Sequence, residues 1–126
     1  MNYDQARAYL LSRPEACEDF PFGADVAVFK IVGRMFATLG ERQGEISMNL
    51  KCDPEEAQFL RDMFIAVRPG YHMNKTHWNT VILDGSIPPG EIERMVDRSY
   101  GLVVRKLKKA QRVGLETRHG SEALYR

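Results

Sequence analysis

Residues 25–51 contain three strand-like segments separated by very short turns, and this arrangement constrains the fold more than any other feature of the sequence. The first segment, residues 25–32, is rich in β-branched and aromatic side chains, and Gly33-Arg34 separates it from the second. A two-residue turn with glycine first is typical of a type II′ hairpin. A polar turn at residues 40–44 leads to residues 45–51, where apolar and polar residues alternate. Because strands joined by such turns run antiparallel, the sequence predicts a three-stranded meander.

Helices are predicted on both sides of this meander. Residues 2–12 begin with the spacing of a capping box and end before Pro14, which stops a helix. Asp53 and Pro54 are residue types preferred where a helix begins. After the meander we therefore expect a helix, a further strand and the longest helix, at residues 53–66, 78–83 and 89–109.

These elements predict an α+β fold of two layers, in which helices pack on one face of an antiparallel sheet. The expected order is helix, three-strand meander, helix, one or two strands and a long helix. A chain of 126 residues is the length of one domain, which we expect to span residues 1–109. Residues 110–126 show no periodicity and are predicted to be a loosely ordered extension.

Composition and charge indicate a cytoplasmic protein, which we expect to be a monomer. No apolar run approaches the roughly 20 residues of a membrane span, and the N-terminus lacks the pattern of a signal peptide. Cys17 and Cys52 have neither metal-site spacing nor a disulfide framework, so reduced thiols are expected. Residues 101–126 carry seven cations and two acids. This basic end is compatible with a polyanionic partner, but helix termini also favour cations.

Residues 67–78 combine two cations, two histidines, a tyrosine, an asparagine and the single tryptophan around a Pro-Gly pair. Such a mixture is poor material for a core, and it suits a surface that meets an anion or a base. The competing interpretation is structural, because Trp78 would pack inside the fold and Asn74 would bond its neighbouring backbone. The sequence leaves both interpretations open.

These segments, taken together, resemble the MmcQ/YjbR family over about residues 2–109. The resemblance is carried by Phe22-Gly23, Val28-Phe29-Lys30, Gly33-Arg34-Met35-Phe36-Ala37, Leu50-Lys51, Arg68-Pro69, Tyr71-His72-Met73-Asn74-Lys75, His77-Trp78, Leu83-Asp84-Gly85 and Ser99-Tyr100. It implies a compact fold of the YjbR or CyaY-like kind and a DNA-binding protein whose β-hairpins act as two wings. Arg34 stands where the family usually has lysine, which keeps the charge.

The resulting hypothesis is a protein that contacts duplex DNA mainly through phosphates. Four cations would supply charge and three polar side chains would orient the contact. The candidate site residues are Arg34, Lys51, Arg68, His72, Asn74, Lys75 and His77. The alternative is a protein-interaction or small-ligand-binding module without a nucleic-acid function.

Catalysis, a metal and a cofactor are not expected. No serine or cysteine lies beside an oriented base in the sequence, and no glycine-rich phosphate loop is present. Cys52 precedes a helix, where its thiol pKa would fall and make it reactive if a histidine lay nearby. His72 and His77 would need Cys52 or Asp84 to complete a metal site.

Overall fold

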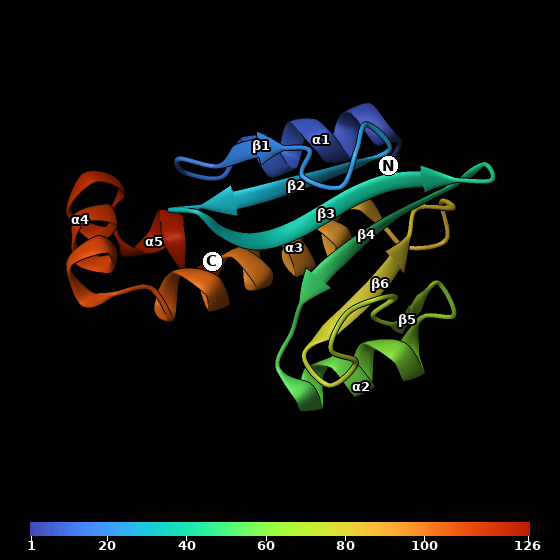
Figure 1. Ribbon diagram of the computed structural model, residues 1–126. Helices are drawn as coiled ribbons and strands as arrows, with labels where there is room; N and C mark the ends of the chain where they lie inside the picture. The colour runs from blue at the N-terminus through green and yellow to red at the C-terminus, as the bar shows by residue number, and fades with distance from the viewer.

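The computed structural model describes residues 1–126 and shows one antiparallel sheet of six strands together with five helices (Figure 1). The strands lie in the order β1-β2-β3-β4-β6-β5. The helices are α1 (Tyr3–Leu11), α2 (Pro54–Met63), α3 (Pro89–Arg105), α4 (Lys109–His119) and α5 (Ser121–Leu124). The strands are β1 (Cys17–Asp19), β2 (Val26–Ile31), β3 (Arg34–Arg42), β4 (Glu45–Lys51), β5 (Val67–Pro69) and β6 (Trp78–Ile82). The predicted α+β class and the order of the main elements are confirmed. The short edge strand β1 was not predicted, and β5 is the second of the one or two strands expected after the second helix.

Both hairpin turns of the meander differ in detail from the sequence prediction. Ile31 pairs with Arg34, so the first turn consists of Val32 and Gly33, both with positive φ. This is the pattern of a type I′ turn, and the predicted type II′ turn at Gly33-Arg34 is wrong. The second turn is equally tight, and the three residues before it belong to β3. Type I′ turns match the twist of the strands but need positive φ at both turn positions, and this backbone is strained at the β-branched Val32.

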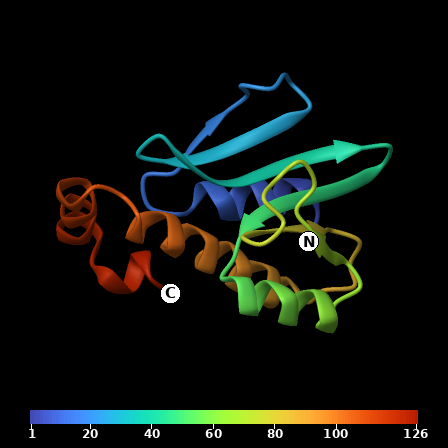
Figure 2. The ribbon, with the colours of Figure 1, turned by 60° about the horizontal axis from the view of Figure 1, so that its bottom comes forward.

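The core lies between one face of the sheet and the helices α1, α2 and α3 (Figures 1 and 2). Strand residues facing this side are apolar and buried, as Leu39, Met48 and Val81 are. A bulge opposite Phe29 gives β3 one additional residue, so Phe36 and the next residue are both buried. The prediction of helices on one face of the sheet is confirmed.

The C-terminal residues form helices, and the prediction of a loosely ordered tail is wrong. The long helix ends at Arg105, and α4 and α5 follow it. Leu115 and Leu124 are fully buried in the same core as the sheet. Each of these two short helices buries a single leucine, which is too few for a period to be visible in the sequence. None of the helices is both long and apolar enough to cross a membrane.

Candidate functional site

The segment between β5 and β6, residues 70–77, folds back over the face of the sheet that the helices leave free (Figure 2). The backbone N–H of Tyr71 donates to Thr80 Oγ1 at 2.9 Å, and Arg42 Nη1 donates to the Tyr71 hydroxyl at 2.6 Å. Thr80 continues a row of hydrogen-bonded side chains across the strands, through Asn49 to Thr38. These hydrogen bonds therefore hold the loop against the sheet.

Arg61 of α2 forms hydrogen bonds with the end of this loop and the start of β6. Arg61 Nε donates to Asn79 Oδ1 at 2.7 Å, and its Nη2 donates to the carbonyl oxygens of Lys75 and Trp78. The Asn79 amide in turn donates to the carbonyl of Ala57 at 3.3 Å. Arg61 thus satisfies the carbonyl of Lys75 and gives a second donor to the carbonyl of Trp78, which already accepts the backbone N–H of Gly70 at 2.9 Å.

Two of the four predicted residues in the loop, Asn74 and Lys75, also have internal partners. Asn74 Oδ1 accepts from the backbone N–H groups of Thr76 and His77, and Lys75 Nζ donates to the carbonyl of Gly70 at 3.0 Å. His72 and His77 are exposed, and the His72 ring lies against Tyr71. Asn74 and Lys75 therefore stabilise the loop through backbone hydrogen bonds, as the structural interpretation proposed for Asn74, while the two imidazoles face solvent. Trp78 is half-buried on β6.

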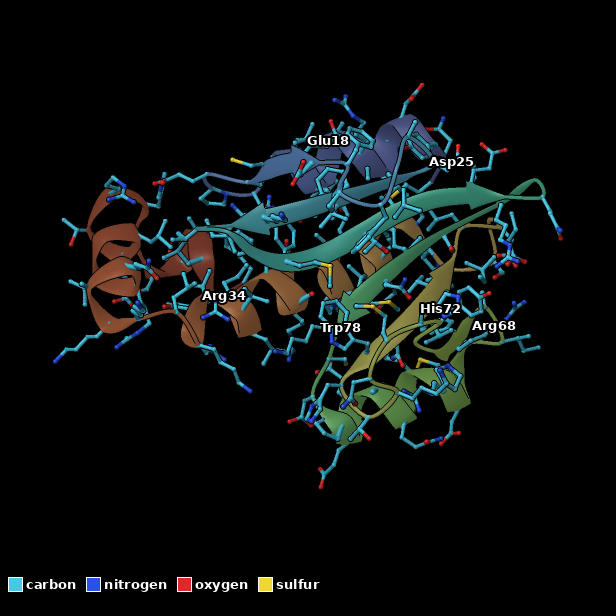
Figure 3. All side chains as sticks on the ribbon, in the orientation of Figure 1. Glu18, Asp25, Arg34, Arg68, His72 and Trp78 are labelled. Atoms are coloured by element: carbon cyan, nitrogen blue, oxygen red, sulfur yellow. The ribbon has the colours of Figure 1, made fainter.

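The structure does not bring the seven candidate residues together. Arg68 and His72 lie at one side of the molecule and Arg34 lies well away from them (Figure 3). Arg68 is exposed and pairs with Glu45 at 3.6 Å. Of the predicted cations, Arg34 and Lys51 share one cavity. The predicted surface is thus divided into a loop region and a separate pair of cations.

Arg34 and Lys51 are joined by a third cation, Lys106, in a cavity of about 240 Å³. Met35 and Val103 complete its lining, and no acidic residue takes part. The pairing of β3 with β4 ends at Ala37 and Leu50, so the start of β3 and the end of β4 lie at the same end of the sheet. Lys106 directly follows the end of α3. None of the three cations forms an ion pair within the chain, in contrast to Lys30, which pairs with Asp19. We call Arg34, Lys51 and Lys106 the cation cluster.

A buried serine holds the elements of the cation cluster in place. Ser99 Oγ donates to the carbonyl of Phe36 at 2.5 Å and accepts the backbone N–H of Lys51 at 2.8 Å. Ser99 is fully buried, so α3, β3 and β4 are joined by one side chain. Lys106 lies seven residues after Ser99, which is two helical turns and therefore the same side of the helix.

The charges of the cation cluster influence one another. Burial lowers the pKa of Lys51, and the positive charge of Lys106 lowers it further. An anion between the two ammonium groups would favour their charged forms and raise that pKa. The cation cluster is therefore a site that a bound anion would stabilise.

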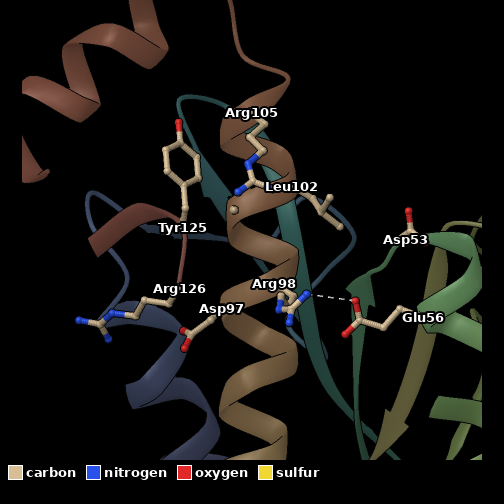
Figure 4. A pocket seen from close by; sticks show the side chains of 9 residues that line it. Asp53, Glu56, Asp97, Arg98, Leu102, Arg105, Tyr125 and Arg126 are labelled. Atoms are coloured by element: carbon tan, nitrogen blue, oxygen red, sulfur yellow. Dashed lines mark hydrogen bonds and ion pairs between the residues drawn. The ribbon is translucent and has the colours of Figure 1, made fainter. Parts of the chain in front are cut away.

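A second hollow, of about 470 Å³, lies on the outer side of α3 and has a different charge balance (Figure 4). Arg98 pairs with Glu56 across it at 3.4 Å, and Arg105 lies over the ring of Tyr125. Three acidic and three arginine side chains line this hollow, so its charges offset each other. It is a weaker candidate for an anion than the cation cluster.

Cys52 does not have the environment of a reactive thiol. The side chain is buried, and burial together with nearby Glu56 and Asp53 raises its pKa to about 12. The proposed effect of the following helix is thus outweighed by desolvation and by negative neighbours. No group of three or more His, Cys, Asp or Glu side chains is arranged to hold a metal.

Lys106 is the cluster residue that the site prediction omitted. It was visible only as one of several basic residues near the end of the long helix. It lies 55 positions after Lys51 in the sequence, and no local spacing links the two. Their proximity depends on where α3 packs across the sheet.

The sequence is similar to that of one family and to several of its relatives. The family model called YjbR matches residues 11–102. The "Uncharacterized protein YjbR" of Escherichia coli K12 is 34% identical over 112 residues, which cover 89% of this chain and 95% of that protein. The "Uncharacterized protein YyaQ" of Bacillus subtilis is 43% identical over 60 residues, covering 47% of this chain and 50% of that protein.

Solved structures show the same fold. The crystal structure of the Deinococcus radiodurans protein DR2400, a DUF419 domain, matches with a TM-score of 0.81 and 37% identity. The match covers 89% of this chain and 86% of that one. A protein from Pseudomonas syringae matches with a TM-score of 0.74 and 29% identity, over 81% of this chain and 98% of that one. The architecture is therefore shared with experimentally determined relatives.

Proposed function

Because the chain belongs to the YjbR family, we propose that it is a non-catalytic protein that binds DNA, mainly through backbone phosphates. The observation that carries this proposal is the cation cluster, whose three cations face one cavity without an acidic partner. Unpaired cations gathered on one surface attract a polyanion, and phosphate contacts supply most of the affinity of sequence-independent binding.

The position of the cation cluster agrees with the wing hypothesis in part. Arg34 follows the turn between β2 and β3, so this hairpin would serve as one wing. Lys108 and Lys109 are exposed just beyond Lys106 and extend the positive surface. The loop cations contribute less in this proposal, because Lys75 and Arg68 already have partners within the chain.

The test is a titration of a short duplex at two salt concentrations. Three phosphate contacts predict that affinity falls roughly 40-fold between about 50 and 200 mM salt, since each contact adds about 0.9 to the logarithmic slope. Lys106→Gln and Arg34→Gln should each weaken binding and reduce that slope by about 1. Arg94→Gln is the matched control, because Arg94 is exposed on α3, the helix that ends directly before Lys106, but pairs with Glu91. Absence of binding at low salt contradicts the proposal.

A second candidate function, protein interaction, is favoured by exposed apolar side chains near the end of α2. Phe59 is 58% exposed and Ile65 is 96% exposed, which is unusual for large apolar residues outside an interface. Sedimentation at increasing protein concentration tests for self-association through this surface. If the surface is an interface, Phe59→Ser abolishes association and leaves DNA affinity unchanged. A monomer at every concentration argues against self-association there.

A further inference from the structure

The cation cluster forms a concave site of restricted size. Its volume of about 240 Å³ lies below the range of about 300–1,000 Å³ for pockets that hold whole drug-sized ligands. A single phosphate group with part of its hydration fits such a space. A nucleoside would extend beyond it.

The lining of the cavity favours ligands that carry negative charge. Arg34, Lys51 and Lys106 are its only polar side chains, and Met35 and Val103 offer no hydrogen bonds. A ligand held here is therefore recognised through oxygen atoms that carry negative charge. The cavity offers donors only, so among base edges it complements just the acceptor pair of guanine, whose O6 and N7 carry no net negative charge.

The number of cations favours a terminal phosphate over a phosphate within a strand. A phosphodiester carries one negative charge and has a substituent on two sides. A phosphate monoester carries about 1.5 to 2 negative charges near pH 7 and presents three free oxygens. Three cations that lie around one cavity can each contact one of these oxygens. The rest of the strand, attached through the fourth oxygen, can extend out through the opening of the cavity.

We propose that the cation cluster binds the phosphate monoester at the 5′ end of a DNA strand. This proposal rests on the DNA-binding function proposed above and names the group that enters the cavity. The strand is favoured over a free phosphate because Lys108 and Lys109 are exposed within three residues of Lys106 and do not line the cavity, so they are available to further phosphates of the same strand. The hydrogen bonds of Ser99 join the backbone of β3 and β4 to α3, which keeps the three elements that carry the cations together.

The experiment compares two DNA hairpins that differ only at the single 5′ terminus, which carries either a phosphate or a hydroxyl. A fluorophore in the hairpin loop reports binding by anisotropy. We expect the phosphorylated hairpin to bind about tenfold more tightly, the effect of one additional charge-assisted hydrogen bond. Lys106→Gln should remove this preference, and Arg94→Gln should retain it. Inorganic phosphate, followed through the NMR amide signals of Lys51 and Lys106, tests the site without DNA.

The possible outcomes separate this inference from the proposed function. Equal affinity for both hairpins, with both weakened in Lys106→Gln, overturns the monoester site and leaves phosphate-mediated DNA binding in place. Binding of neither hairpin overturns both. If inorganic phosphate shifts the two amide signals while neither hairpin binds, the cavity is a phosphate site and its assignment to DNA is overturned.

Discussion

At the scale of single residues, the two cysteines occupy opposite environments, and this difference predicts their reactivity. Cys17 is exposed, whereas Cys52 is 6% exposed and burial raises the pKa of its thiol to about 12. Because the thiolate is the nucleophile, iodoacetamide should modify Cys52 at least about a hundredfold more slowly than Cys17 in the folded protein. Mass spectrometry of digested samples measures both rates. Urea-unfolded protein is the control, in which the two rates should converge. Similar rates in the folded protein would show that Cys52 is accessible.

At the scale of elements, Glu15 fastens α4 to the loop after α1. Hydrogen bonds from Arg118 and then His119 lower the pKa of Glu15 from 4.5 to about 2. A carboxyl whose pKa is lowered by folding contributes stability above pH 4.5, and the contribution is lost as pH falls toward 2. Glu15→Gln should therefore lower the Tm slightly near about pH 6, since exposed ion pairs are screened, and by less near about pH 3. Thermal unfolding followed by circular dichroism measures this. Glu122→Gln, at an exposed position of α5, should change nothing. A Tm difference independent of pH would contradict the assignment.

At the scale of the whole molecule, the C-terminal helices and the sheet share one core. Leu115 is fully buried, whereas Val113 on the same helix is 43% exposed. Leu115→Ala should lower the free energy of unfolding by about 2–5 kcal/mol because it leaves a cavity. Val113→Ala should change it by no more than about 0.5 kcal/mol. Urea unfolding measures both, and the transition should remain a single cooperative step. If Leu115→Ala melted only the C-terminal residues and left the main transition unchanged, the helices would be an independent appendage.

Local patterns predicted much of the fold and less of the site. The meander, α1, α2 and α3 carry strong signals, because capping residues and apolar periodicity act within a few positions. The edge strands β1 and β5 are three residues long, too short for a period of two to be recognised. The site prediction found Arg34 and Lys51 but assigned them to the same surface as the loop residues. Sequence separation alone could not show that Arg61 and neighbouring backbone groups would form hydrogen bonds with polar groups in and next to that loop.

The sequence by itself determined the α+β class, the antiparallel meander and the helix starts, because turns and caps are decided by neighbouring residues. Only the tertiary structure decided which polar groups remain without partners. Asn74 and Lys75 were satisfied by backbone within the loop, whereas Lys106 came to lie beside Lys51 because Ser99 fixes α3 on β3 and β4. Hydrogen bonds and charge pairing depend on distances of a few ångströms between elements, and packing sets those distances.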